Sequence, residues 1–288
     1  TINCGLVDTQ IRVKNNGQNT INEILITYSI SDNTPFGNQN FEQLWTGELL
    51  SLDTEIIDLE TLDLDQGSRE MEVSVSIEND TFDSNNYKSV VFQVNDSGLA
   101  QSVMTFETSA DRLLEVAEYG SKNWEFGVPD GENLNSVSSG QKVYGTNLEG
   151  NYLDNSKTYL YTPCYDLTNL SDPILKFDMA FDIEFDWDLL YLEYSNDQGQ
   201  NWNILGDSYD PNWYNSSRVS GDGVNNNCYN CVGSQWTGTE LEMQEYSYNL
   251  ANIDDYNNII FRFVFHTDEY VNQEGVIIDD LVIEGTTL

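Results

Sequence analysis

Short runs in which apolar and polar residues alternate recur along the chain, and this period of two constrains the fold more than any other feature. In the stretch 173–202 the alternation runs through Ile174–Met179 and again through Leu189–Tyr194, as in half-buried strands. The sequence Asn196–Gly199 supplies a turn after the second run. We therefore interpret the stretch as the central hairpin of a β-domain, with four acidic residues in its connection: Asp182, Glu184, Asp186 and Asp188.

Composition favours strands over helices throughout. Tyrosine (17 residues) and tryptophan (6 residues) are plentiful, whereas the helix formers Ala, Lys and Arg are scarce. Leu113–Tyr119 is the one stretch for which we predict a short helix. The length of 288 residues suffices for two domains, each with a core of its own. The sequence thus predicts an all-β protein of two domains.

Residues 1–97 are predicted to form the first domain, an immunoglobulin-like β-sandwich. Strand-like runs follow one another there at regular spacing: residues 10–14, 24–30, 45–49, 54–59, 71–77 and 90–94. About seven short strands within roughly 100 residues are typical of this fold. The turn-rich sequence Asn95–Gly98 is the predicted boundary, and residues 98–288 form the second domain.

The chain is strongly acidic, with 49 Asp and Glu residues, 11 Lys and Arg residues and a formal net charge of −38. This charge repels nucleic acid and anionic membranes, so neither is an expected partner. No apolar run is long enough to cross a membrane, and no signal peptide begins at Thr1. We expect a mature or excised part of a larger protein, whose charge is screened by a saline habitat, by bound Ca²⁺ or by both. The alternative is an acidic, soluble surface without a specific role.

The four cysteines are Cys4, Cys164, Cys228 and Cys231. One CxxC pair without a second pair or a histidine pair does not make a zinc site. The CxxC pair lies in an Asn-rich loop, so a disulfide between Cys228 and Cys231 is favoured over a thioredoxin-like motif, which requires a βαβ context. Cys4 and Cys164 either pair with each other or remain as buried thiols.

No catalytic site is predicted in this chain. The single histidine, His266, ends a strand-like run and has neither an HExxH motif nor a GxSxG motif beside it. The acidic connection at 182–188 offers carboxylate pairs of the kind that glycosidases use. Among 49 acidic residues such proximity arises by chance, and neighbouring carboxylates need a cation or solvent to be tolerated. An exposed edge or a second Ca²⁺ site, in addition to the one described below, is the preferred interpretation of this connection.

Aromatic residues in loops are the candidate ligand-binding residues. The long, Asn-, Gly- and Ser-rich loop 208–240 carries several of them. Exposed aromatic rings stack on sugar faces and dominate protein-binding surfaces. The predicted set is Trp187, Tyr209, Trp213, Tyr214 and Trp236. The alternative is that each ring tucks under its own loop as a local core.

A succession of short motifs in the second domain resembles a known family. The motifs are Phe106–Glu107, Asn123–Pro129, Gly145–Tyr152, Leu160–Leu167, Glu193–Trp202 and Gly275–Ile283. Over residues 103–285 they resemble the MAM-like, cleaved-adhesin or choice-of-anchor-J jelly rolls. Those domains occur in large secreted proteins of marine Bacteroidetes and in gingipain haemagglutinin regions, often beside metalloproteases. The first domain resembles the fibronectin type III-like repeats found beside secreted bacterial enzymes, which act mostly as spacers.

The resemblance implies a two-sheet β-jelly roll with a structural Ca²⁺, for which an early Glu and an Asp of the last strand approach each other. Glu107 and Asp280 or Asp279 stand at those positions, and Asn151 and Asp154 are candidates for further oxygen ligands. Ca²⁺ prefers such hard oxygens, and no EF-hand loop is present.

Taken together, the sequence predicts a non-catalytic accessory and adhesion region of a larger secreted or cell-surface bacterial protein. Its expected partners are adjacent domains of the parent chain and either a polysaccharide or a surface protein. The alternative is a purely structural spacer that supports an adjacent hydrolase such as a metalloprotease.

Overall fold

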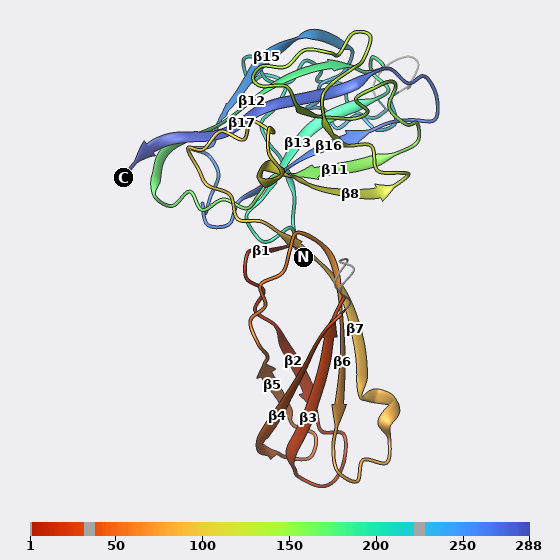
Figure 1. Cartoon of the computed structure of the whole chain (residues 1–288), viewed down its shortest axis with the longest axis vertical. Helices are drawn as coiled ribbons and strands as arrows, with labels where there is room; N and C mark the ends of the chain where they lie inside the picture. The colour runs from red at the N-terminus through yellow and green to blue at the C-terminus, as the bar shows by residue number, and fades with distance from the viewer. Residues whose placement is uncertain (1, 32–37, 222–227) are drawn as a thin grey trace. The chain divides into compact units, whose positions relative to one another are not determined.

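Strands dominate the structure, as the alternating pattern predicted. The computed structural model describes residues 2–31, 38–221 and 228–288. The chain divides into two units, Thr1–Asp96 and Ser97–Leu288. Apart from the 3-10 helices η1 (Asp83–Asn85) and η2 (Ser109–Asp111), the regular structure of the described residues consists of strands, which confirms the all-β class (Figure 1). None of the helices found in this part of the chain has the length and apolarity to cross a membrane.

Unit 1 is a sandwich of two unequal sheets. The larger sheet has the strand order β1 (Ile2–Cys4), β7 (Tyr87–Asn95), β6 (Gly67–Ser76), β3 (Ile21–Ile30) and β4 (Gln39–Leu49). The smaller sheet consists of β2 (Gln10–Lys14) and β5 (Thr54–Asp58), paired antiparallel. In the larger sheet only β1 runs parallel to its neighbour, β7.

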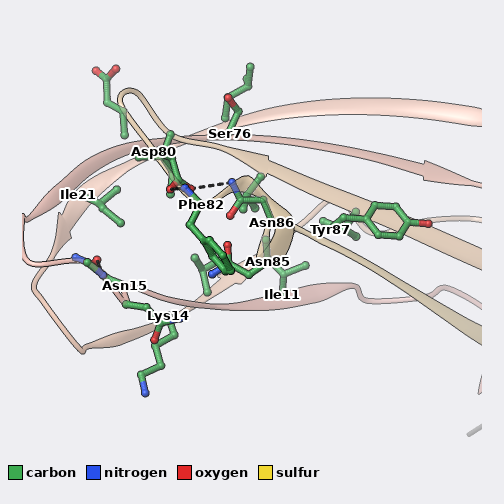
Figure 2. Close-up of a pocket in the computed structure, with 18 of the residues that line it drawn as sticks. Ile11, Lys14, Asn15, Ile21, Ser76, Asp80, Phe82, Asn85, Asn86 and Tyr87 are labelled. Carbon is green, nitrogen blue, oxygen red and sulfur yellow. Dashed lines mark hydrogen bonds between the residues drawn. The ribbon is translucent and has the colours of Figure 1, made fainter.

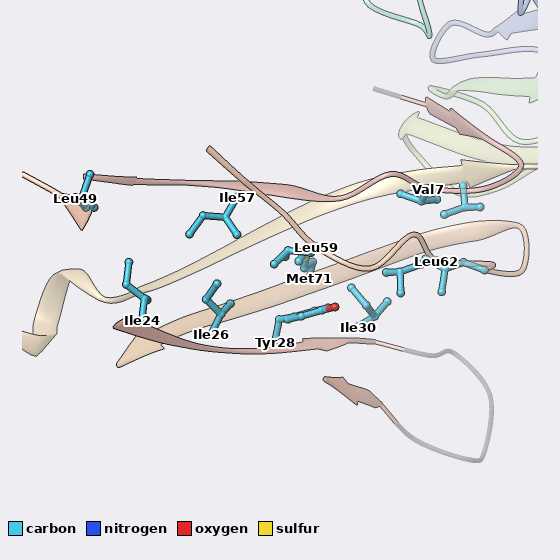
Figure 3. Close-up of a cluster of buried hydrophobic side chains, with 12 residues drawn as sticks. Val7, Ile24, Ile26, Tyr28, Ile30, Leu49, Ile57, Leu59, Leu62 and Met71 are labelled. Atoms are coloured by element: carbon cyan, nitrogen blue, oxygen red, sulfur yellow. The ribbon is translucent and has the colours of Figure 1, made fainter. Parts of the chain in front are cut away.

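The core of unit 1 follows from the period of two in β3. Ile24, Ile26, Tyr28 and Ile30 alternate along the strand and all point inward, where they are buried (Figure 3). Ile57 of β5 belongs to the same cluster, so the two-stranded sheet closes part of the core from the other side.

Unit 2 is a sandwich of two five-stranded sheets. The first has the order β15 (Thr239–Asn249), β12 (Leu170–Asp182), β17 (Gly275–Thr287), β10 (Val143–Gly145) and β9 (Glu125–Gly127). The second has the order β14 (Asn203–Ile204), β13 (Leu189–Ser195), β16 (Ile260–His266), β11 (Lys157–Tyr161) and β8 (Leu114–Tyr119). Their inner faces meet where Phe177 of β12 packs edge-on against Phe263 of β16, with ring centroids 5.0 Å apart.

The predicted hairpin at 173–202 is wrong, because its two strands belong to different sheets. β12 pairs with β15 and β17, whereas β13 pairs with β14 and β16. The acidic connection therefore crosses from one sheet to the other. It turns where the N–H groups of Trp187 and Asp188 donate to the Glu184 carbonyl, and Asp186 adopts a φ of 65° there. Alternation predicts which face of a strand is buried but does not predict its partner.

The predicted helix at Leu113–Tyr119 is also wrong. Residues 114–119 form β8, which pairs antiparallel with β11. Leu114 is buried beneath this sheet. Strand pairing and burial outweigh a helix preference that is worth only a few tenths of a kcal/mol per residue.

Candidate functional site

Three carboxylates from two connections of unit 2 come together beside the start of β13 and the end of β16. Oxygen atoms of Glu184, Asp188 and Asp268 lie within 4.8 Å of one another. Glu184 and Asp188 belong to the connection between β12 and β13, and Asp268 follows β16. The register that pairs Leu189 with His266 explains the meeting, because it places the start of β13 beside the end of β16.

Asp188 is the anchored member of this acidic cluster. It is exposed to only 1%, and its two oxygens accept hydrogen bonds from the Tyr152 hydroxyl at 2.5 Å and from the Asp268 N–H at 2.7 Å. Burial raises the pKa of Asp188 to about 7, although these two hydrogen bonds lower it. Burial also raises the pKa of Glu184, and the negative charges of Asp268 and Asp154 add to that rise. Ionising all three carboxylates of the cluster therefore costs free energy unless a bound cation balances their charge.

Hard oxygen ligands at this spacing suit a divalent cation such as Ca²⁺, which takes six to eight oxygens from carboxylates, carbonyls and water. Tyr152 holds the cluster in place: its hydroxyl donates to Asp188 and accepts the Glu184 N–H at 3.1 Å.

The other two acidic residues of the connection have partners elsewhere. Asp186 forms an ion pair with Arg218 at 2.6 Å, and Asp182 accepts a hydrogen bond from the Thr239 hydroxyl at 3.1 Å. Only two of the four acidic residues that the sequence singled out in this connection thus belong to the acidic cluster.

Three of the predicted metal ligands surround a different loop, residues 138–142. Glu107 accepts the backbone N–H groups of Gln141 and Lys142 at 2.7 and 2.8 Å. Asp279 is buried and accepts the N–H groups of Ser138 and Ser139, while the Ser139 hydroxyl donates to Asp280 at 2.6 Å. Burial raises the pKa of Asp279 to about 6. Glu107 and the Asp279–Asp280 pair thus contact the same loop, and their role as metal ligands stays a prediction.

The remaining two predicted ligands lie in the connection before β11. The Asn151 side-chain amide donates to the backbone and side-chain oxygens of Asn272 at 3.0 Å. Asp154 lies close enough to Glu184 for its charge to raise the pKa of that residue, so it neighbours the acidic cluster. The sequence did not identify Asp268 or Tyr152. The only available signal was that Asp268 follows a strand end as Glu184 does.

Three of the five predicted ligand-binding aromatics are core residues, so the expected exposure is wrong for them. Trp213, Tyr214 and Trp236 are almost completely buried. The rings of Trp213 and Trp236 lie 5.1 Å apart, and both pack edge-on against Phe177 of β12. The physical reason is that their polar atoms find carbonyl partners inside: Trp236 Nε1 donates to the Trp213 carbonyl, Trp213 Nε1 to the Leu205 carbonyl and the Tyr214 hydroxyl to the Leu192 carbonyl.

The other two residues of that set remain at the surface. Trp187 is partly buried, and Tyr209 is exposed to 89%. Cys228 and Cys231, for which the sequence favoured a disulfide, are bonded to each other. Within the described residues no cysteine is a free thiol. Cys4 and Cys164 are therefore not buried thiols, which was one of the two alternatives that the sequence left open. Residues 222–227 of the long loop lie outside the described residues.

Exposed aromatic side chains flank the acidic cluster instead. Phe185, next to Glu184, is exposed to 67%, and Tyr270, two residues after Asp268, is exposed to 72%. Leu153 and Val271 in the neighbouring loops are exposed as well. Exposed apolar side chains thus lie on the same two connections that supply the carboxylates of the acidic cluster.

Comparison with known proteins gives one sequence relative and several structural likenesses, and no family model matches the chain. The chain is 30% identical over 168 residues to Bacillopeptidase F of Bacillus subtilis (strain 168), a match that covers 58% of the chain. It spans only 10% of that protein.

Two solved structures illustrate the structural likenesses. The K1 cleaved adhesin domain of Lys-gingipain from Porphyromonas gingivalis W83 is 14% identical, with a TM-score of 0.37, 66% of this chain covered and 99% of that domain covered. The CBM22-1 xylan-binding domain from Paenibacillus barcinonensis is 10% identical, with a TM-score of 0.33, 67% of this chain covered and 99% of that domain covered.

Proposed function

We propose that the chain is a non-catalytic binding region of a larger secreted protein, and that a Ca²⁺ ion held by Glu184, Asp188 and Asp268 orders the loops that contact its ligand. The observation that carries the proposal is the meeting of these three carboxylates within 4.8 Å beside the exposed rings of Phe185 and Tyr270. A cation bound to the native state alone both neutralises the cluster and fixes the loops that carry the rings.

A polysaccharide is the ligand class that we favour. Phe185 and Tyr270 present aromatic surface to solvent, and such rings stack on sugar faces at low cost in conformational entropy. The net charge of −38 disfavours polyanions as ligands, so neutral polysaccharides are expected to bind better than acidic ones. The sequence-based resemblance to MAM-like and cleaved-adhesin jelly rolls is compatible with this role.

Affinity gel electrophoresis against a panel of neutral and acidic polysaccharides tests the proposal. We expect retardation by at least one neutral polysaccharide in CaCl₂ and none in excess EGTA. Replacing both Phe185 and Tyr270 by Ser should weaken binding at least tenfold, because the stacking surface is removed. Tyr229→Ser is the matched control, since Tyr229 is exposed to the same 72% as Tyr270 but lies in the disulfide loop.

Three results would contradict the proposal: no retardation by any polysaccharide, retardation that survives chelation, or an equal loss for Tyr229→Ser. Hydrolysis of a polysaccharide that Asp188→Asn abolishes would instead indicate an enzyme.

A structural support role is the second candidate, and the similarity to part of Bacillopeptidase F favours it. In that case the chain would hold or position a neighbouring peptidase domain without a ligand of its own. Removing residues 97–288 from the parent protein should then lower the amount of folded peptidase that is secreted. No polysaccharide in the gel should retard the isolated chain.

A further inference from the structure

Unit 1 has an open groove that the proposed function does not use. It runs between β2 and the uncovered parts of β6 and β7, and Ile11, Ile21 and Phe82 are among the side chains that line it (Figure 2). Phe82 is exposed to 65%. Apolar side chains from both sheets thus face an open space at one side of the sandwich.

The groove exists because the two sheets have unequal widths. β2 pairs with β5 alone among the described residues, so two strands face a sheet of five. The register pairs Met71 with Val90 and Val73 with Lys88, which places Val90 and Lys88 on the same inner face as the core residue Met71. Val90 is nevertheless exposed to 52%, because no strand of the smaller sheet reaches over it. The unpaired edge of β2 therefore leaves room for one more strand in the smaller sheet.

The neighbouring edge of β7 is also largely free. β1 pairs with β7 only at Gln93–Asn95, so residues 87–92 have no strand partner on that side within the described part of the chain. The free backbone N–H and C=O groups of an unpaired strand edge can pair with an added strand, and the apolar side chains between the edges of β2 and β7 can pack against it.

Unit 1 concentrates its positive charge at this groove. Residues 1–96 contain 17 acidic residues and only four basic ones, Arg12, Lys14, Arg69 and Lys88. Arg69 is buried and donates to backbone carbonyls, whereas Arg12, Lys14 and Lys88 all line the groove. Within the described residues these three make no ion pair.

Acidic residues line the groove in the same number as the cations, but within the described residues none of them forms an ion pair with Arg12, Lys14 or Lys88. Glu23, Glu78 and Asp80 belong to the lining, and Asp80 accepts hydrogen bonds from the Phe82 N–H and the Asn86 side chain. Arg12 and Lys14 are exposed on the outer side of β2, while Ile11 and Val13 point inward and pack on the core. A strand beside β2 would meet apolar residues on its inner side and two unpaired cations on its outer side.

We propose that this groove binds an extended peptide strand in which apolar and acidic residues alternate. The strand would pair with the free backbone groups of β2, its apolar side chains would cover Val73 and Val90, and its acidic side chains would lie beside Arg12 and Lys14. Residues directly opposite each other on neighbouring strands point to the same side, so the alternation of β2 dictates the alternation of its partner.

Fluorescence anisotropy with a labelled, capped heptapeptide of alternating Val and Glu tests the proposal. One control peptide carries Lys in place of Glu, and a second contains the same residues as the probe with all Val before all Glu. We expect the probe to bind the whole chain at least tenfold more tightly than either control and to lose affinity as salt is raised. The net charge of −38 works against an acidic peptide, so overall charge cannot produce this preference.

Charge reversal then assigns the binding to β2. The double variant Arg12→Glu, Lys14→Glu should bind the Lys-containing peptide better than the Glu-containing probe. Val90→Asp should weaken both. Lys122→Glu, which changes an exposed lysine of unit 2, is the control and should leave the preference unchanged.

Absence of probe binding, equal affinity for the three peptides, or an unchanged preference in the double variant would overturn the proposal. Sedimentation velocity tests whether a second copy of the chain fills the groove instead. A dimer of the unmodified chain that Val90→Asp abolishes would show this, and it would also contradict a peptide ligand. Neither result bears on the calcium site, because the groove residues and the acidic cluster belong to different units.

Discussion

At the scale of single residues, the candidate metal site shows what a sequence can and cannot identify. Glu184 and Asp188 stood out because four acidic residues crowd one connection. Asp268 is 80 positions further on and becomes a neighbour of Asp188 only through the pairing of β13 with β16. Local sequence therefore predicted an acidic segment, whereas the third carboxylate required the sheet register.

His266 gives a prediction at the same scale. Burial lowers the pKa of His266 to about 4, and the nearby charge of Lys157 lowers it further while Glu118 opposes this. The ordinary pKa of histidine is about 6.5, so the unfolded chain binds the extra proton between pH 6.5 and 4. Above pH 6.5 His266 is neutral in both the folded and the unfolded chain, and its contribution to stability is fully present. That contribution is lost as the pH falls from 6.5 to 4, because only the unfolded chain binds the proton there.

Urea unfolding at pH 7 and pH 5.5 measures this contribution. We expect the original chain to lose about 1 kcal/mol more stability over this step than His266→Gln does. Comparing the two proteins is necessary because Asp188 and Asp279, whose pKa values are raised, titrate in the same range with the opposite sign. An identical pH dependence in both proteins would show that His266 titrates normally in the fold.

At the scale of elements, alternation predicted most strands but not their partners. The runs in β3 and β16 were recognisable because one side of each strand is apolar. The assignment of β12 and β13 to different sheets was not, since two strands joined by a short connection present the same pattern whether they pair or cross between sheets. Burial of the loop aromatics was missed because their partners depend on how the loop folds: Trp213 Nε1 donates to the Leu205 carbonyl just before the loop, and Trp236 Nε1 donates to the Trp213 carbonyl, 23 residues earlier in the same loop.

Trp236 tests whether this loop is a core element. Trp236→Ala should lower the free energy of unfolding of unit 2 by about 3–5 kcal/mol, because it empties a site that contacts Phe177, Trp213 and Tyr246. Tyr209→Ala, an exposed aromatic of the same loop, should change it by less than about 0.5 kcal/mol. Denaturant unfolding followed by near-UV circular dichroism measures both, and equal losses would contradict the assignment of core and surface.

At the scale of the whole molecule, the two units carry different candidate binding sites. Unit 2 carries the acidic cluster with its exposed rings, and unit 1 carries the groove with three of its four cations. Overall composition predicted an acidic, strand-rich protein that avoids nucleic acid. It did not predict where the few unpaired cations gather, because that depends on which edge of a sheet is left without a partner.

Calcium binding by unit 2 is the central claim, and thermal unfolding with and without the cation tests it most directly. Ca²⁺ at about 100 times its Kd should stabilise the native state by about 2.7 kcal/mol, which corresponds to a rise in Tm of roughly 5–10 °C. Glu184→Gln and Asp188→Asn should abolish the rise. Asp182→Asn, in the same connection but bonded to Thr239, should keep it. An unchanged Tm in excess chelator, or a rise that survives in Glu184→Gln and Asp188→Asn, would contradict the account.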